Sequence, residues 1–128
     1  MAKRTSIYVD GFGHKNPIPA ACRIGNLVMS GGIHGIDPAT GRVADGLDDQ
    51  CRLMLGHVRR IVEAAGGTLD DIVKLTVWMT DRSQRAVLNR YWVELFPDEQ
   101  SRPARHTMTA ALDGGMLVQC DFTAVLGG

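Results

Sequence analysis

An apolar stripe of helical period, from about Asp48 to Ala65, constrains the fold of this chain more than any other feature. Apolar residues recur there at steps of three and four, as they do on one face of a helix. Polar residues such as Gln50 and Glu63 fall mostly outside the stripe. Asp48 suits the N-cap position, and Gly66 suits a left-handed stop. The stripe consists of Cys51, Met54, Leu55, Val58, Ile61, Val62 and Ala65.

The segment that follows, Ile72 to Thr80, alternates as a strand does. Alternation places two sets of side chains on opposite faces: Val73, Leu75, Val77 and Met79 on one, and Lys74, Thr76 and Trp78 on the other. A second amphipathic helix is predicted from about Ser83 to Phe96, where Pro97 ends it. Its stripe consists of Val87, Leu88, Tyr91, Trp92 and Leu95.

Shorter strands flank these segments. Ile7 to Val9 is a strand candidate, and a loop is predicted from Asp10 to Pro19. Gly25-Asn26 favours a tight turn between strands 21–24 and 27–30. Two strands close the chain, the last from Met116 to Leu126 after a turn at Gly114-Gly115. This order predicts an α+β fold with both helices on one face of a mostly antiparallel sheet.

The other face of that sheet also needs cover. Trp78, Met108 and Met116 are too apolar to be left in water in quantity, so the sequence predicts association. The chain's 128 residues are predicted to form a single domain, 1–128.

The charges of the chain balance, with 14 Lys plus Arg against 14 Asp plus Glu. That balance predicts no general attraction to nucleic acid or to an anionic membrane. No segment is apolar enough to predict a bilayer span. The three cysteines form no Cys-x-x-Cys pair, which favours a reducing compartment, and a cytoplasmic location is predicted.

Several segments, taken together and in order, resemble the Rid family (reactive intermediate deaminases, also called the YjgF family). The resemblance extends from about Pro17 to Val125. Any one segment is weak, but their order and spacing are specific to the family. The segments are residues 24–28, Asp37-Pro38-Ala39-Thr40-Gly41, 62–66, 70–74, Thr76-Val77 and Arg102-Pro103-Ala104-Arg105.

The resemblance implies a chorismate-mutase-like domain that assembles as a homotrimer, with sites in the clefts between subunits. It implies that the stretch around Arg105 opens a C-terminal hairpin. It also implies that Arg105 grips the carboxylate of a small 2-imino or 2-enamino acid. An arginine suits that task because its planar fork pairs with a carboxylate through two parallel hydrogen bonds.

The chain departs from the family at several site positions. Ile18 stands where the family often has a tyrosine, and Thr107 where it often has a cysteine. Gln119 matches a glutamate that positions the attacking water in well-studied deaminases. A glutamine can orient a water but cannot take its proton. The family's Ser-Gly-Gln matches either 31–33 or 30–32, and Gly32 is taken as a substrate-binding position.

Strand alternation sorts the neighbours of these residues. Thr107 shares a face with Arg105 and could donate to a substrate, or it could simply be a good strand former, while His106 points away. Asp121 shares a face with Gln119 and is either a replacement base or a strand-edge charge. Cys120 faces away from Gln119, so no cysteine nucleophile is predicted.

Two further residues complete the predicted substrate site. Asn89 matches a family asparagine that touches the site, or it is a solvated helix residue. His34 could donate a proton in place of the missing tyrosine, or it could be structural. Neither His14 nor His57 has a sequence neighbour that suggests a metal, so neither a metal nor a cofactor is predicted.

Two functions from different classes remain open. The first is hydrolytic deamination of small carboxylated imines or enamines to 2-oxo acids and ammonia, or a related hydrolase step in a catabolic pathway. The second is a non-catalytic trimer that binds a small carboxylate as a sensor or partner protein. Ribonuclease activity, described for some relatives, is disfavoured by the neutral charge.

Overall fold

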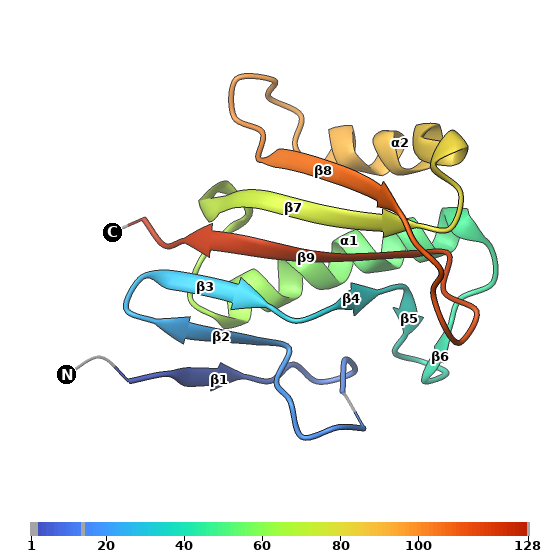
Figure 1. Cartoon of the computed structure of the whole chain (residues 1–128). Coiled ribbons are helices and arrows are strands. Elements are labelled where there is room, and N and C mark those ends of the chain that lie inside the picture. The colour runs from blue at the N-terminus through green and yellow to red at the C-terminus, as the bar shows by residue number, and fades with distance from the viewer. Residues whose placement is uncertain (1–2, 14, 128) are drawn as a thin grey trace.

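The computed structural model describes residues 3–13 and 15–127. Within these residues the chain forms one seven-stranded sheet, a small two-stranded sheet and two α-helices (Figure 1). The elements, in chain order, are β1 (Thr5–Ile7), β2 (Ala21–Ile24), β3 (Leu27–Ser30), β4 (Ile33–His34), β5 (Ile36–Asp37), β6 (Arg42–Val43), α1 (Leu47–Ala64), a 3₁₀ turn (Leu69–Asp71), β7 (Ile72–Met79), a second 3₁₀ turn (Arg82–Gln84), α2 (Arg85–Leu95), β8 (Ala104–Thr109) and β9 (Val118–Val125).

The main sheet has the order β1-β2-β3-β9-β7-β8, and β4 also pairs with β9. Only β7 and β8 run parallel within it, because α2 crosses over between them. The predicted C-terminal hairpin is therefore wrong: β8 and β9 lie on opposite sides of β7 and do not pair with each other. The mixed, mostly antiparallel α+β fold is confirmed.

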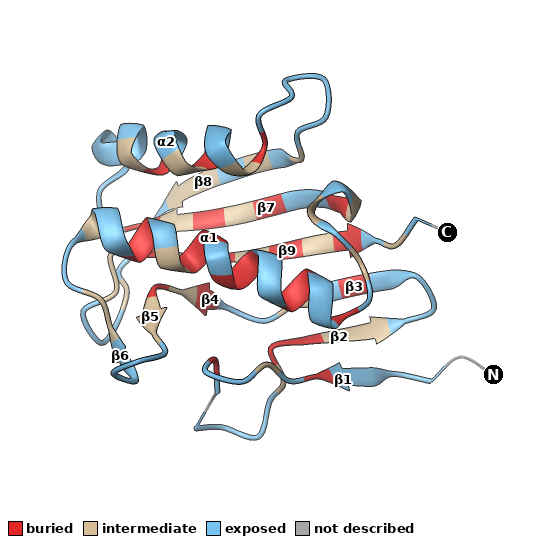
Figure 2. Ribbon diagram, turned by 180° about the vertical axis from the view of Figure 1, so that it is seen from behind, coloured by how far each residue is buried: buried red, intermediate tan, exposed pale blue. Residues whose placement is uncertain are grey.

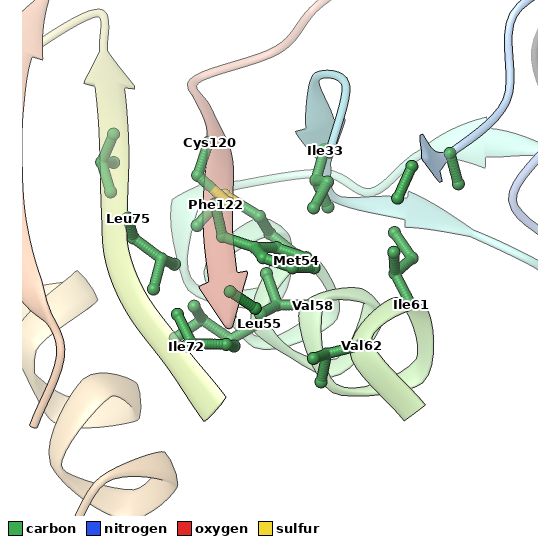
Figure 3. Close-up of a cluster of buried hydrophobic side chains, with 14 of the residues drawn as sticks. Ile33, Met54, Leu55, Val58, Ile61, Val62, Ile72, Leu75, Cys120 and Phe122 are labelled. Atoms are coloured by element: carbon green, nitrogen blue, oxygen red, sulfur yellow. The ribbon is translucent and has the colours of Figure 1, made fainter. Parts of the chain in front are cut away.

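Both helices pack on the same face of the sheet, which Figure 2 shows from the helix side. The whole predicted stripe of α1 is buried against that face. Figure 3 shows Met54 and Val58 of α1 directed towards Phe122 of β9, with Ile33 of β4 beside them. These side chains are fully or almost fully buried and belong to one continuous core.

The start of α1 differs from the prediction. Gly46 occupies the N-cap position, with φ of 78°, and no side chain caps the helix. Asp48 lies one residue inside α1. Its carboxylate instead pairs with Arg90 of α2 and accepts a hydrogen bond of 2.6 Å from the hydroxyl of Tyr91. Asp48 therefore joins the two helices rather than capping one.

The alternation of β7 breaks near its start. Leu75, Val77 and Met79 are buried as predicted, but Val73 is 53% exposed. The register with β9 shifts between Ile72 and Lys74, which is a β-bulge that turns Val73 outward and buries Ile72. The first core residue of β7 is therefore Ile72, and not Val73 as simple alternation indicates.

The predicted strands 21–24 and 27–30 are confirmed with their bounds, and the first and last strands and the second helix have altered ends. The hairpin of β2 and β3 turns at Gly25, whose φ is 59°. The first strand ends at Ile7 rather than Val9, and the last begins at Val118 rather than Met116. The second helix begins at Arg85, after a 3₁₀ turn.

The face of the sheet away from the helices, called the open face from here on, carries apolar side chains. Ile24, Leu27 and Met29 are 47%, 43% and 52% exposed on β2 and β3. Trp78, Met108 and Met116 are each half-buried. Within residues 3–13 and 15–127, no helix combines the length and apolarity needed to cross a membrane.

A buried histidine sits between the core and the N-terminal loop. The Nε2 atom of His57 lies 2.7 Å from the carbonyl oxygen of Ile36, so Nε2 carries the proton and donates it. Nδ1 is buried and has no hydrogen-bond partner in the described part of the chain. Burial lowers the pKa of His57, and the charge of Arg60 lowers it further, while the bond to Ile36 opposes both.

The lowered pKa of His57 predicts acid sensitivity. The unfolded chain takes up a proton near pH 6.5, before the folded chain does. The free energy of unfolding should therefore fall as the pH drops from 7.5 through 6.5 and below. His57→Gln, which can keep the bond to Ile36, should lessen this fall in denaturant titrations. His106→Gln, at an exposed histidine, is the control. Equal pH dependence in the wild type and His57→Gln would contradict the assignment.

Candidate functional site

Arg105 lies on β8, on the face that α2 covers. Its register partner is the buried Leu75 of β7, so its side chain leaves the sheet on the helix side. Nη2 donates to Oδ1 of Asn89 at 2.7 Å, and the guanidinium lies over the ring of Trp92, 4.9 Å from its centroid. Asn89 and Trp92 are three residues apart on α2 and therefore share a face.

The guanidinium of Arg105 is only partly satisfied. Nη1 is buried and has no hydrogen-bond partner in the described residues. Burial lowers the pKa of Arg105, and the charge of Arg85 lowers it further. The group nevertheless stays protonated at any working pH. A buried N–H donor without an acceptor is costly, so this atom is suited to an anionic ligand.

The neighbours of Arg105 on β8 follow the predicted alternation. Thr107 pairs in register with the buried Val77 and lies on the Arg105 face. Its carbonyl oxygen accepts a hydrogen bond of 3.4 Å from Arg82. His106 is exposed and pairs with Thr76, so it belongs to the open face.

A second group of predicted site residues lies on the open face. Gln119 of β9 pairs in register with Trp78 on one side and with His34 on the other. A depression of about 200 Å³ opens at this point. Its lining consists of Phe12, Gly13, Gly32, His34, Met116 and Gln119. The structure therefore brings together three predicted residues, Gly32, His34 and Gln119.

Gly32 has a specific steric role in this depression. A Cβ atom at position 32 would lie 2.3 Å from Nε2 of Gln119. The amide of Gln119 thus occupies the space that a side chain at position 32 would fill. Glycine at this position determines where the amide can lie.

Gln50 has a structural role that the helical pattern does not predict, because the residue falls outside the apolar stripe. Gln50 is 1% exposed and joins α1 to two loops. Its Nε2 donates to the carbonyl oxygens of Ala44, at 2.9 Å, and Gly115, at 3.1 Å. Its Oε1 accepts from the backbone N–H of Leu117 at 2.8 Å. These bonds fix the loop that carries Met116 into the depression.

Phe12 was also missed, because it lies in a segment with no periodic signal. It is buried, and its ring packs against His34, with centroids 5.7 Å apart, and against His57, at 5.0 Å. Ile18 is 47% exposed in the N-terminal loop and does not line the depression.

Asp121 shares the open face with Gln119, as predicted, beside Thr76. Burial raises the pKa of its carboxyl group, and Lys74 partly offsets the shift. Cys120 points into the core, as predicted. Burial raises the pKa of its thiol, and burial with the charge of Asp48 raises that of Cys51 to about 12. Neither thiol is suited to nucleophilic attack.

Among residues 3–13 and 15–127, no three His, Cys, Asp or Glu side chains gather as a metal site would require. His14, considered above as a ligand, lies outside the described residues. The Arg105 group and the Gln119 group lie on opposite faces of one sheet. Within one chain they therefore do not face a common cleft.

Comparison with known proteins gives a consistent result. The sequence model of the family described as endoribonuclease L-PSP matches residues 14–126. A RutC family protein of Pyrococcus horikoshii is 38% identical over 90 residues, which is 70% of each chain. The 2-iminobutanoate/2-iminopropanoate deaminase of Salmonella typhimurium is 37% identical over 89 residues, 69% of this chain and 70% of that one.

Solved structures agree over nearly the whole chain. The crystal structure of TdcF from Escherichia coli with bound serine has a TM-score of 0.88 at 29% identity, covering 96% of this chain and 99% of the other. RidA from the Antarctic bacterium Psychrobacter gives a TM-score of 0.88 at 31% identity, covering 95% and 99%.

The close approach of the Gln119 amide to Gly32 leads to a testable prediction. Gly32→Ala should displace the flexible amide of Gln119 and leave the backbone in place, so the free energy of unfolding should change by less than about 1 kcal/mol. The side-chain amide resonance of Gln119 should shift in NMR spectra. Gly31→Ala is the control, because a Cβ there meets only ordinary contacts at 3.7 and 3.8 Å. An unmoved Gln119 resonance in Gly32→Ala would show that the amide does not depend on Gly32.

Proposed function

This chain belongs to the Rid family, whose sequence model carries the description endoribonuclease L-PSP, and from that premise we propose that it hydrolyses the C=N bond of small 2-imino acids. Deamination is the activity for which relatives such as the Salmonella protein are named. The products would be a 2-oxo acid and ammonia.

The observation that carries this proposal is the unpartnered Nη1 of Arg105. Asn89 holds one end of the guanidinium and Trp92 covers its plane, so the fork is already oriented. A substrate carboxylate would supply the missing acceptor at Nη1. The TdcF structure contains bound serine, which also has a carboxylate adjacent to the carbon that bears nitrogen.

The complete site requires two copies of the chain. Arg105, Asn89 and Thr107 lie on the helix side of the sheet, whereas Gly32, His34 and Gln119 lie on the open face. The apolar open face favours association. In a homotrimer with a three-fold axis, the open-face group of one copy can meet the Arg105 group of the next.

The proposed reaction needs only a modest rate acceleration from the protein, because an imine is already reactive. A water oxygen adds to the imine carbon, its protons pass to nitrogen, and the C–N bond breaks to release ammonia. The carbonyl oxygen of the Gln119 amide would orient the water, while Arg105 holds the carboxylate. An amide cannot accept the water's proton, so His34 or Asp121 would move it.

A second function, non-catalytic binding of a small carboxylate, is favoured by one specific residue. Gln119 occupies the position where the family's deaminases use a carboxylate, and its replacement removes the most direct general base. The same Arg105 contacts would serve a sensor or partner protein. Ammonia release from freshly generated 2-iminopropionate separates the two functions.

Arg105→Ala should abolish binding of small 2-oxo acids, and Arg105→Lys should restore it poorly, because lysine keeps the charge but loses the fork. The loss should amount to roughly 2–5 kcal/mol if the pair is desolvated. Calorimetry on the folded variants measures it. Arg59→Ala, at an exposed arginine of α1, is the matched control. Unchanged affinity in Arg105→Ala would remove Arg105 from the site.

Gln119→Glu should raise the deamination rate, because a carboxylate can polarise or deprotonate the attacking water. The gain should lie towards the low end of the roughly 10²–10⁴-fold that general-base help contributes, since an imine is already reactive. The pH–rate profile should acquire a rising limb from the new carboxylate. A well-folded Gln119→Glu that is slower than the wild type would point to another group as the activator of water.

The shared site predicts complementation between inactive variants. Arg105→Ala lacks the carboxylate contact, and Gln119→Ala lacks the group that holds the water. In randomly mixed three-fold rings, about a quarter of the sites combine two intact halves. Co-refolded mixtures should therefore regain activity that neither variant has alone. Mixed trimers, verified by native mass spectrometry, that stay inactive would contradict a site between subunits, and a stable monomer in sedimentation would exclude it.

A further inference from the structure

A second arginine lies on the same helix face as the partner of Arg105. Arg85 is the first residue of α2, and Asn89, which accepts the hydrogen bond of Arg105, follows four residues later. Residues at this spacing lie side by side on a helix, with their Cβ atoms about 5–6 Å apart. The Arg85 side chain is exposed, so its guanidinium is accessible beside the partly buried guanidinium of Arg105.

Neither arginine forms an ion pair within the described residues. The ion pairs found there join Arg52 to Asp49 and Arg90 to Asp48, and neither includes Arg85 or Arg105. Asp81, the acidic residue that precedes α2, accepts two hydrogen bonds from Ser83. The backbone N–H of Ser83 donates at 2.9 Å and its hydroxyl at 2.6 Å.

The two charges influence each other. Burial is the main cause of the lowered pKa of Arg105, and the charge of Arg85 lowers it further, in keeping with the place of Arg85 one helical turn before Asn89. A third cation, Arg82, is anchored on the carbonyl oxygen of Thr107 in the same region. One carboxylate bound to Arg105 would neutralise only part of this charge, whereas a ligand with two anionic groups would neutralise more of it.

We propose that the substrate is a 2-imino dicarboxylic acid, with Arg105 binding the carboxylate next to the imine and Arg85 binding the distal carboxylate. This inference rests on the proposed function and adds the substrate class to it. Arg85 is then the residue that determines specificity.

A matched pair of ligands tests this assignment. 2-Oxoglutarate and 2-oxopentanoate have the same five-carbon chain. The first ends in a distal carboxylate, and the second ends in a methyl group. Calorimetry at low ionic strength should give the wild type an affinity for 2-oxoglutarate about three- to fivefold higher than for 2-oxopentanoate, consistent with one partly exposed ion pair. The advantage should shrink as salt is added. Deamination of 2-iminoglutarate and 2-iminopentanoate should show the same preference in kcat/KM.

Variants of Arg85 identify the cause of the preference. Arg85→Gln should remove the advantage of 2-oxoglutarate and leave the affinity for 2-oxopentanoate within about twofold of the wild type. Arg85→Lys should retain part of the advantage, because the charge remains. Arg59→Gln removes one charge from an exposed position on α1 and should retain all of it, which controls for the change in net charge.

The possible failures are distinguishable. Equal affinity of the wild type for the two ligands overturns the dicarboxylate assignment. An equal loss of affinity for both ligands in Arg85→Gln overturns it as well. In either case the proposed function stands as long as 2-oxopentanoate binding still requires Arg105. Retention of the preference in Arg85→Gln overturns the role of Arg85. If the wild type binds neither 2-oxo acid and deaminates neither imine, the proposed function fails together with this inference.

Discussion

The packing of α1 and α2 against a single face of the sheet is the constraint on which the rest of this structure depends. It gathers the apolar core between the helices and the sheet, where Ile33 and Phe122 lie close to α1 (Figure 3). Beyond the bulge of β7, successive residues of β7, β8 and β9 point alternately to the helices and to the open face. The Arg105 group and the Gln119 group fall on different sides for this reason alone. The proposed site uses both groups and therefore requires a second copy of the chain.

Much of the fold could be predicted from periodicity. The α1 stripe and the buried residues Leu75, Val77 and Met79 follow directly from the alternation and the helical repeat. The errors arise where tertiary structure overrides local pattern. Val73 is turned outward by a β-bulge, which has no signal in the sequence around it. The family resemblance implies a hairpin of β8 and β9, whereas the α2 crossover makes β8 a parallel neighbour of β7.

The candidate site was predicted in its parts rather than in its arrangement. Arg105 and Gln119 stay predicted site residues that rest on motif resemblance, whereas alternation placed their strand neighbours on the faces that the structure shows. Polar residues whose roles depend on distant partners escaped detection. Gln50 bonds to residues 65 and 67 positions away, and Arg85 matters only because Asn89 and Arg105 meet. Neither relation can be derived from the residues adjacent in sequence.

The hydrogen bonds of Gln50 affect local unfolding of the loop that carries Met116. Its amide joins the first turn of α1 to Gly115 and Leu117, and Gly35 packs so closely that a Cβ there would lie 2.5 Å from Cα of Gln50. Detachment of the loop that carries Met116 therefore breaks both of these hydrogen bonds and leaves the buried Gln50 amide unsatisfied. Protection of the Leu117 backbone amide against hydrogen exchange should accordingly follow that of the helix rather than that of a surface loop. The wall of the depression and the core of the domain then behave as a single cooperative unit.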